Sequence, residues 1–335
     1  MTTIILTPSE VRRLLPMREC IDAVAGALRA LSTGEALNPL RWGVRLPAER
    51  GLIGLMPGFL PGTGALGLKA VTFFPGNHGT PYDSHQGVVV LFDPQHGVPT
   101  GIFDASEITA IRTAAASAVA TRALARDDAG DLALLGAGVQ ARTHLEAMAV
   151  VRKLRRVRVW SPTAHEREAF ARRESGRHGV AVEVSASARA ALCGADLVCT
   201  ATAARTPVVA GEWLAPGAHV NAVGACFPAA RELDTAAVLR SRLYVDRRES
   251  ALAEAGDILI PIDEGALTDA HIVAEIGEVL AGSAPGRGSA SEITLFKSLG
   301  LAVEDLAAAG YLLQRARLEG VGARVELGGM RREAP

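Results

Sequence analysis

The residue pattern best suited to chemistry is a glycine-rich turn in the middle of the chain. An apolar run at 132–135 leads into Gly136-Ala137-Gly138-Val139-Gln140-Ala141, and a helical pattern follows. Gly136 permits a tight turn, Gly138 lets the backbone approach a pyrophosphate, and Ala141 allows the helix to pack closely on the strand. A plain turn without a ligand is the alternative. The flanking strand and helix favour a dinucleotide site, because N–H groups at a helix start bind phosphate.

The end of the next strand-like run bears on which dinucleotide is bound. A NAD-specific site usually has an acid about 20 residues beyond the glycines, where it accepts hydrogen bonds from the ribose. Here the run 157–160 is followed by Ser161-Pro162-Thr163, and the first carboxylate comes at Glu166. A 2′-phosphate would meet little repulsion there, so the sequence favours NADP(H) over NAD(H). The expected contacts are hydroxyls from Ser161 and Thr163 and a positive charge from Arg158, His165 or Arg167.

Two cations stand in unusual sequence surroundings. Lys69 interrupts the strand-like apolar run 67–74, and Arg112 opens an Ala-rich helical stretch with no acid close by in sequence. A buried carboxylate or phosphate requires cationic donors, and a guanidinium can bind either in a bidentate manner. Both residues are therefore candidates for ligand binding. The alternative for Lys69 is a strand residue that faces solvent.

Hydrophobic periodicity indicates which elements must position these residues. After Asp131, strand and helix patterns alternate, which is typical of a parallel, doubly wound sheet. The residues before it, 41–103, form short β-like runs separated by Gly, Pro, Asn and Asp, as in a mixed or antiparallel sheet. Strands of the alternating part are expected at 132–135, 157–160, 180–184, 197–200, 219–223 and 242–245, and helices of the chain at 17–32, 107–126 and 301–320.

Composition excludes several classes of protein. A chain of 335 residues suits two domains, and a net charge of −1 makes nucleic acid an unexpected partner. The basic stretch 152–158 is expected at the solvated end of a helix. The 4 cysteines show no CxxC spacing, so neither a disulfide nor a metal site is predicted. No apolar run reaches the roughly 20 residues that cross a bilayer and no signal-peptide pattern is present, so a cytoplasmic protein without a membrane partner is expected.

Four segments, in this order along the chain, resemble the ornithine cyclodeaminase/mu-crystallin family. They are Ile111-Arg112-Thr113-Ala114-Ala115, the glycine turn at 136–141, Asn221-Ala222-Val223-Gly224-Ala225 and the segment 293–300. The resemblance runs from about Leu6 to about Gly310. It implies an α/β fold in which a Rossmann NAD(P)-binding domain, 119–300, is inserted into an α+β dimerisation and substrate-binding domain formed by residues 1–118 and 301–335. It also implies a homodimer joined through the sheet of the latter domain.

The resemblance further implies an activity at a carbon that bears an α-amino or α-imino group. The expected function is NAD(P)H-dependent reduction of a small imino acid, such as the cyclic ketimines Δ1-pyrroline-2-carboxylate and Δ1-piperideine-2-carboxylate. Two other interpretations stay open. One is an ornithine or lysine cyclodeaminase that uses NAD catalytically, and the other is a mu-crystallin-type protein that holds NADPH and a ligand without turnover.

By the same resemblance, individual residues receive roles. Those expected to hold the substrate are Arg45, Lys69, Arg112 and Lys297, and those expected near the reacting atoms are Lys69, Arg112, His85 and Cys226. His85 either relays a proton or is simply a hydrogen-bonded residue at the start of a strand. Residues expected to contact the cofactor are Ser84, Arg112, Thr113, Gly136, Gly138, Val139, Gln140, Ser161, Thr163, Arg167, Thr202, Val223 and Gly224.

Cys226 departs from the cyclodeaminase pattern. In those enzymes a catalytic Asp follows a Val-Gly-Gly turn, whereas here Val223-Gly224-Ala225 precedes Cys226. A thiol with a reference pKa of about 8.5 is mostly neutral at neutral pH and is a weak hydrogen-bonding partner. This favours the reductase over the cyclodeaminase, and it leaves open whether Cys226 acts in catalysis or only lines the pocket.

Overall fold

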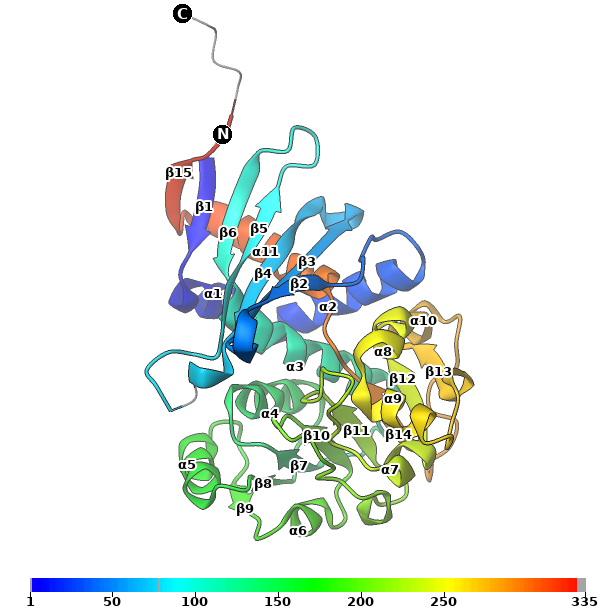
Figure 1. Cartoon of the computed structure of the whole chain (residues 1–335). Helices are drawn as coiled ribbons and strands as arrows, with labels where there is room; N and C mark the ends of the chain where they lie inside the picture. Colours follow the sequence, from blue (N-terminus) through cyan, green and yellow to red (C-terminus); the bar gives the residue numbers. More distant parts are fainter. Residues whose placement is uncertain (1, 78, 330–335) are drawn as a thin grey trace, which may run out of the picture. The chain divides into compact units, whose positions relative to one another are not determined.

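The computed structural model describes residues 2–77 and 79–329 of the chain. They form two compact units, of which the first comprises residues up to Arg112 together with those from Leu301 onward, and the second runs from Thr113 to Gly300 (Figure 1). The division falls within a single helix, α3 (Ala105–Leu124), a little before the boundary at 118 expected from the sequence. Residue 1 and residues 330–335, which the expected first domain includes, lie outside the described residues.

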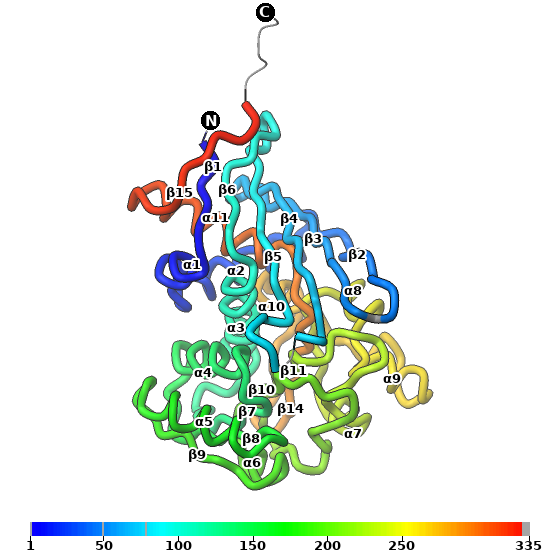
Figure 2. The backbone as a smooth tube through the Cα atoms, turned by 60° about the vertical axis from the view of Figure 1, so that its left-hand side comes forward, coloured from blue at the N-terminus to red at the C-terminus, as the bar shows by residue number. Residues whose placement is uncertain are grey.

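The first unit contains a mixed sheet of seven strands. They are β1 (Thr2–Leu6), β2 (Trp42–Arg45), β3 (Leu52–Leu60), β4 (Ala65–Phe73), β5 (His85–Phe92), β6 (Pro99–Asp104) and β15 (Ala323–Glu326), in the order β15-β1-β6-β5-β4-β3-β2. Only β1 and β6 are parallel neighbours. Figure 2 shows β15 beside β1, so segments from both ends of the chain lie at one edge of the sheet. The sequence predicted neither edge strand, because both are short and exposed throughout and so lack a pattern of alternation.

Helices cover one face of this sheet. They include α1 (Pro8–Leu14), α2 (Met17–Ser32) and α11 (Ala302–Glu319). The tail helix α11 packs on α2 and lies against β3–β6 (Figure 1). The predicted apolar stripe of α2, formed by Ile21, Val24, Leu28 and Leu31, is buried. Each fully buried aliphatic side chain contributes roughly 1.5–3 kcal/mol, so this stripe fixes which side of α2 faces the core.

The other face of the sheet is apolar and partly exposed. Cross-strand pairing places Leu55, Ala70 and Val88 in one row of that face, and Ile53 lies in the next row. Ile53 and Val88 are 39% and 40% exposed. An antiparallel sheet often leaves one face to solvent, but that face is then usually polar. Apolar side chains on it are typical of a surface that binds a partner.

The second unit contains a sheet of eight parallel strands, which confirms the predicted Rossmann-type architecture. The strands are β7 (Asp131–Leu135), β8 (Arg156–Trp160), β9 (Val182–Val184), β10 (Leu197–Thr200), β11 (His219–Ala222), β12 (Ser241–Val245), β13 (Ile272–Glu275) and β14 (Ile293–Lys297). Their order is β13-β12-β14-β11-β10-β7-β8-β9, and every neighbouring pair is parallel. Residues 132–135 of β7 are fully buried, as a strand covered on both faces requires.

Helices lie on both faces of this parallel sheet. On one face lie α3 and α4 (Val139–Val151), which are joined by a 2.9 Å hydrogen bond between Ser117 Oγ and His144 Nε2. The core of the other face includes residues of α6 (Ala188–Leu192), α7 (Thr235–Leu239), α8 (Arg248–Glu254) and α9 (Gly256–Asp263). The remaining helices of the unit are α5 (Ala164–Glu174) and α10 (Ile276–Ala281). Over the described ranges of both units, no helix has the length and apolar character to span a bilayer.

The basic stretch 152–158 differs from its predicted environment. Helix α4 does end at Val151, but Arg158 lies within β8 and is only 4% exposed. Its guanidinium Nη1 donates to the carbonyl oxygens of Ala190 and Cys193, at 3.1 and 2.6 Å. The expectation of a solvated arginine is therefore wrong for Arg158, and this residue no longer stands among the cations expected near a 2′-phosphate.

Candidate functional site

Lys69 lies on the helix-covered face of the first sheet. In β4 it is opposite Met56 of β3 and Val89 of β5, and Val89 is opposite Phe103 of β6. Directly opposed residues of antiparallel strands share a face, and these three apolar neighbours are almost completely buried. Lys69 itself is 2% exposed. The alternative of a strand lysine that faces solvent is therefore wrong.

A buried cluster of four charges surrounds this lysine. Lys69 Nζ lies 2.7 Å from Asp305 Oδ2, while Arg112 Nε donates to Asp305 Oδ1 at 2.9 Å. Arg112 Nη1 also donates to Glu304 Oε2 at 2.8 Å. Asp305 thus bridges the two cations and fixes their spacing. Burying such charges is costly unless each has a partner, and here two acids balance two cations.

The sequence did not predict Glu304 and Asp305 as site residues. They are adjacent acids in the first turn of α11, both fully buried, in a helix whose neighbouring positions are apolar. Two adjacent acids among apolar residues could have indicated a buried site. Acids in the first turn of a helix are also common at a surface, however, because the helix dipole favours them there. Arg112, which has no acid close by in sequence, acquires both partners from a segment 192 and 193 residues away.

The pKa values in this cluster reflect burial and the neighbouring charges. Burial and the charge of Arg112 lower the pKa of Lys69 to about 8, although Asp305 opposes the shift. Burial also disfavours the charged form of Arg112, but Asp305 and Glu304 outweigh it and raise the pKa of this guanidinium further, so Arg112 stays charged. The charge of Arg41 contributes to lowering the pKa of Lys69. Arg41, which is half-buried just before β2, is therefore another cation near the cluster that the sequence did not single out.

Arg45 and His85 lie farther along the same face. Arg45 of β2 is opposite Leu52, Leu52 is opposite Phe73, and Phe73 is opposite His85. Since alternate residues of a strand share a face, this row is on the side of Lys69, about 13 Å away along β4. Arg45 is exposed at the sheet edge. The structure therefore places Arg45, Lys69 and His85 on one face of the sheet, with Lys69 at its buried end.

His85 is fixed by two neighbours. Its ring is packed against Phe73, with 4.7 Å between the ring centroids, and its Nδ1 is hydrogen-bonded to Ser84 Oγ at 3.0 Å. Desolvation and the charge of Lys69 lower the pKa of His85 below its ordinary value. The ring is thus predominantly neutral near neutral pH, so it can accept or donate a hydrogen bond without carrying charge.

The glycine turn of the second unit fits a dinucleotide phosphate. Gly136 has a φ of +115°, and a Cβ there would lie 2.4 Å from the carbonyl oxygen of Ala201. Gly138 precedes α4 with a φ of −90°, and a Cβ there would meet no described atom within 4 Å. No side chain in the described ranges caps this helix end by a hydrogen bond. Packing within the protein thus requires glycine at 136 but not at 138, where open space and N–H groups suit a pyrophosphate.

The turn after β8 differs in one respect from its sequence interpretation. Ser161 is 4% exposed, and its Oγ donates to Glu166 Oε2 at 3.3 Å. Arg167 Nη1 folds back to the carbonyl oxygen of Ser161 at 2.8 Å. Thr163 precedes α5, so helix geometry returns residues 166 and 167 to the turn. A carboxylate is therefore present beside Ser161 after all, together with the guanidinium of Arg167.

A buried carboxylate that the sequence did not suggest organises the carboxyl edge of the parallel sheet. Glu232 Oε1 accepts hydrogen bonds from the backbone N–H and the hydroxyl of Thr202, both at 2.7 Å. Its Oε2 accepts from Thr200 Oγ1 at 2.6 Å and from the N–H of Gly224 at 2.7 Å. Burial and the charge of Asp257 raise the pKa of Glu232, and Lys297 opposes this. Two residues predicted to contact the cofactor, Thr202 and Gly224, thus share one acceptor.

Lys297 and Cys226 lie at the same edge. Lys297 Nζ donates to the carbonyl oxygen of Ala225 at 2.6 Å and lies 2.9 Å from Asp257 Oδ2. Burial opposes the charged form of Lys297, but Asp257, Cys226 and Glu232 together outweigh it and raise the pKa of this lysine. Cys226 is half-buried, and its Sγ donates to the carbonyl oxygen of Val223 at 3.5 Å. Lys297 is thus a buried bridge within the second unit, and its role toward a substrate stays a prediction.

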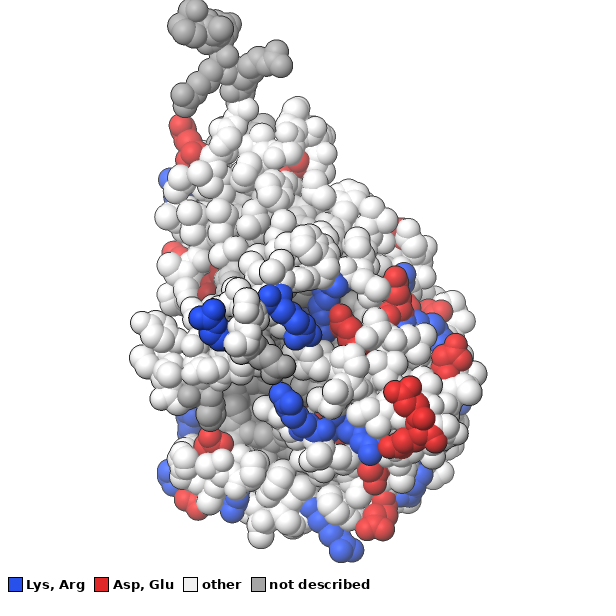
Figure 3. Space-filling model, in the orientation of Figure 1, with Lys and Arg blue, Asp and Glu red and all other residues white. Residues whose placement is uncertain are grey.

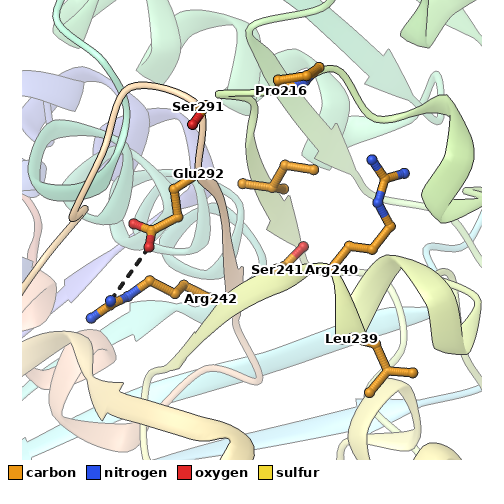
Figure 4. Close-up of a pocket in the computed structure, with 8 residues that line it drawn as sticks. Pro216, Leu239, Arg240, Ser241, Arg242, Ser291 and Glu292 are labelled. Carbon is orange, nitrogen blue, oxygen red and sulfur yellow. Dashed lines mark hydrogen bonds and ion pairs between the residues drawn. The ribbon is translucent and has the colours of Figure 1, made fainter.

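The other predicted cofactor contacts have varied surroundings. Thr113 of α3 and Val223 are buried, Val139 is 54% exposed at the first position of α4, and Gln140 follows it. A separate pocket of about 430 Å³ lies at the amino edge of the parallel sheet, where β12 and β14 begin. Figure 4 shows the residues that line it. Arg242 in that pocket donates to Glu292 at 3.4 Å and to the hydroxyl of Tyr244 at 3.1 Å. None of the predicted site residues lines it.

Charge is mixed on the face of the molecule that Figure 3 shows. On the face shown in Figure 3, basic and acidic side chains lie interspersed over the second unit, with white surface between them. This agrees with the net charge of −1. The face in view therefore presents no extended field of one sign that would attract a polyanion.

Comparison with known proteins gives consistent results. The ornithine cyclodeaminase/mu-crystallin family profile matches residues 1–320. The chain is 44% identical over 276 residues to the ketimine reductase mu-crystallin of Mus musculus, covering 82% of this chain and 84% of that protein. A solved Thermococcus litoralis Δ1-pyrroline-2-carboxylate reductase in complex with NADH and L-proline superposes with a TM-score of 0.94 at 40% identity, covering 96% of this chain and 100% of the other.

A second solved structure, of an archaeal alanine dehydrogenase dimer with bound NAD, has a TM-score of 0.93 at 33% identity and covers 98% of this chain and 100% of the other. These likenesses extend over both units of the fold and over the segments that carry Lys69, the glycine turn and Lys297. The chain therefore belongs to the ornithine cyclodeaminase/mu-crystallin family.

Proposed function

We propose that this protein is an NAD(P)H-dependent reductase of small imino acids, above all cyclic ketimines such as Δ1-pyrroline-2-carboxylate and Δ1-piperideine-2-carboxylate. The observation that carries this proposal is the buried Lys69–Asp305–Arg112 bridge, which holds two cations at a fixed spacing in a protein that also has a dinucleotide-type glycine turn. Two relatives are named as reductases of the same chemical class, a ketimine and Δ1-pyrroline-2-carboxylate.

The cations have the task of holding the substrate carboxylate. Lys69 Nζ also donates to Thr109 Oγ1 at 3.4 Å, so one of its three N–H groups remains for a ligand. Arg112 keeps donors beyond those that Asp305 and Glu304 use, since a guanidinium has five N–H groups. Arg41 adds a guanidinium near Lys69, and Arg45 lies farther out on the same face. Binding the carboxylate orients the attached C=N group, so that one face of the imine is presented to the hydride donor. The binding energy of the carboxylate is thus used to align the reacting atoms.

The other predicted site residues are suited to bind the cofactor or to contact the substrate. NAD(P)H, when bound, supplies the hydride that reduces the α-carbon. The glycine turn and the N-terminus of α4 are suited to its pyrophosphate, and Thr202, Val223 and Gly224 to its nicotinamide end. Neutral His85 is suited to hydrogen-bond an imine or amine nitrogen. Cys226, whose Sγ donates to the carbonyl oxygen of Val223, is assigned to the wall of the substrate pocket.

We propose NADP(H) as the preferred dinucleotide, as the sequence indicated. Arg167 at the turn after β8 supports this preference, while Glu166 beside Ser161 opposes it. The guanidinium Nη1 donates to the carbonyl oxygens of Ser161 and Pro162, at 2.8 and 3.5 Å, which leaves the Nη2 group for a phosphate. A phosphate carries more charge than the ribose hydroxyls, so the arginine gains more from NADPH than from NADH.

We also propose a homodimer formed through the apolar face of the first sheet. Ile53, Leu55, Ala70 and Val88 lie on that face, and apolar sheet surfaces of this kind are normally covered in solution. The related alanine dehydrogenase is described as a dimer.

The direct test is a spectrophotometric assay of NADPH and NADH oxidation by the purified protein. The substrates are Δ1-pyrroline-2-carboxylate, Δ1-piperideine-2-carboxylate, and pyruvate mixed with methylamine as a linear imine source. Turnover of at least one cyclic imine with stoichiometric loss of NAD(P)H supports the proposal. Efficient release of ammonia from ornithine with no net change in NAD(H), or tight ligand binding without turnover of any imine, would contradict it.

A further inference from the structure

Four donors at the ends of two strands converge on the carboxylate of Glu232. Thr200 is the last residue of β10, Thr202 lies in the loop after it and Gly224 in the loop after β11. The four donor–acceptor distances lie between 2.6 and 2.7 Å. A carboxylate accepts about four hydrogen bonds when ionised, so both oxygens are fully used. The side chain therefore joins the ends of two neighbouring parallel strands.

The backbone of Glu232 is itself held in place. Its N–H donates to Asp257 Oδ1 at 2.7 Å, and its carbonyl oxygen accepts from the N–H groups of Val208 and Val209 at 2.8 and 3.0 Å. Asp257 is the residue that also lies 2.9 Å from Lys297 Nζ. The backbone of Glu232 thus has a fixed position, and its carboxylate determines where the two loops lie.

The two loops are also in close contact with one another. A Cβ added to Gly224 would lie 2.2 Å from the carbonyl oxygen of Thr202 and 2.4 Å from Glu232 Oε1. Neither loop can move toward the other, and the hydrogen bonds to Glu232 prevent movement apart. Their relative position is therefore set within a narrow range.

We propose that Glu232 is a positioning residue that sets the shape of the nicotinamide end of the cofactor site by holding Thr202 and Gly224. This inference rests on the proposed function, since it takes those two residues to contact the dinucleotide. Glu232 acts through them and touches no reactant. Its role is to keep the dinucleotide aligned. Loss of this carboxylate should therefore weaken dinucleotide binding more than it raises KM for the imine.

The chemistry of the side chain makes this testable. Glu232→Gln keeps the size but replaces one acceptor oxygen by an NH2 group, which faces two donors whichever way the amide is turned. The threonine hydroxyl on that side can turn and accept from the NH2 group, but the backbone N–H of Thr202 or Gly224 then loses its acceptor. Glu232→Asp keeps both oxygens but is one methylene shorter, so it cannot reach all four donors. Thr200→Val removes a single donor with little change in shape, and it leaves the predicted cofactor contacts in place.

The experiment measures dinucleotide dissociation constants by nicotinamide fluorescence, and kcat and KM for both substrates. For Glu232→Gln we expect the dissociation constant of NADPH to rise about tenfold or more, equivalent to about 1.4 kcal/mol, with a lower kcat. The KM for Δ1-pyrroline-2-carboxylate should stay within about twofold of native, since the carboxylate clamp is untouched. Glu232→Asp and Thr200→Val should show smaller effects in the same direction.

The matched control is Glu174→Gln. Glu174 is also a buried glutamate of the second unit, 1% exposed, but its oxygens bind Arg173 and Arg177 in and after α5. We expect it to lower thermal stability without raising the NADPH dissociation constant. Thermal unfolding of every variant separates a general loss of stability from a change at the cofactor loops.

The outcomes distinguish this inference from the proposed function. If the native protein binds neither NADPH nor NADH, the proposed function fails. If the native protein binds a dinucleotide and folded Glu232→Gln binds it with the same affinity and kcat, the positioning role is wrong. Should Glu232→Gln not fold, Thr200→Val decides in its place: native-like dinucleotide affinity and kcat in that variant would overturn the inference.

Discussion

Arg41, just before β2, and Arg45, the last residue of that strand, offer two guanidinium groups for the same carboxylate. Arg41 affects the pKa of Lys69, whereas Arg45 is exposed at the far end of the face. We expect Arg41→Gln to raise KM for the imine about tenfold or more, and Arg45→Gln to change it by less than about threefold. Steady-state kinetics at saturating NADPH measures both. The reverse order would assign the clamp to Arg45, as the sequence predicted.

Lys69 gives the site a pH dependence. With a pKa of about 8, its ammonium loses its charge, and with it much of its attraction for a carboxylate, as the pH rises through that value. We expect the inhibition constant of pyrrole-2-carboxylate, a planar anion without an imine to titrate, to increase above about pH 8. Lys69→Arg keeps its charge and should remove this dependence. A native inhibition constant that is flat across this range would contradict the assignment.

The same pKa shift affects stability in the opposite direction. Because the folded-state pKa of Lys69 lies below the ordinary lysine value, the unfolded chain binds more protons between about pH 8 and pH 10.4. The contribution of Lys69 to the free energy of unfolding should therefore rise with pH over that window. The difference in thermal unfolding temperature between native protein and Lys69→Met, followed across the window, measures this contribution.

Glu166 opposes the proposed cofactor preference. Its carboxylate accepts from Ser161 Oγ and stands where a 2′-phosphate is expected to approach. We expect Glu166→Gln to increase the ratio of kcat/KM for NADPH over NADH by about fivefold or more, since it removes a like charge. Ser161→Asp should shift the ratio toward NADH. An unchanged ratio in both variants would show that the turn after β8 does not select the dinucleotide.

At the scale of elements, the turn between β7 and α4 allows a matched pair of substitutions. Gly138→Ala adds a methyl group to open space at an ordinary φ of −90°, so thermal stability should be native or slightly higher. The same methyl group lies where a pyrophosphate approaches, and we expect dinucleotide affinity to fall about tenfold or more. Native affinity in Gly138→Ala would contradict the phosphate role of this turn.

Gly136→Ala is the counterpart in this pair. Its φ of +115° and the 2.4 Å approach to the Ala201 carbonyl oxygen require both strain and displacement of the β10 loop. We expect a loss of about 1–3 kcal/mol or more in the free energy of unfolding. Denaturant unfolding of the two variants therefore separates a glycine needed by the fold from one needed by the ligand.

At the scale of the whole molecule, the apolar face of the first sheet predicts self-association. Val88→Lys and Ile53→Lys place a charge on that face, and we expect them to convert a dimer into a monomer. Leu252→Lys in α8 is the control, because Leu252 has a similar exposure of 38% but lies in the second unit. Light scattering after size-exclusion chromatography measures the mass. A dimer that persists in both sheet variants would exclude this face as the interface.

The sequence by itself determined the features that depend on neighbouring residues in the chain. The apolar strand 132–135, the two glycines that follow and the start of α4 form one local unit, so their spacing was enough to predict the turn. The alternation of strands and helices after Asp131 predicted a parallel sheet, because each short crossover must return the chain to the same edge. Lys69 was also predicted as a site residue for a local reason, because it is a single charge in an apolar strand.

Only the tertiary structure decided what those residues contact. Asp305 reaches Arg112 from 193 positions away, and Glu232 accepts hydrogen bonds at the ends of two strands. Arg158 is turned into the fold, whereas Glu166 is returned to the turn by α5. A hydrogen bond between distant segments has no counterpart in hydrophobic periodicity or residue spacing, which report only how each segment meets the core. Which buried charges pair with one another depends on which helices and strands pack together. That packing is settled only when each unit has folded.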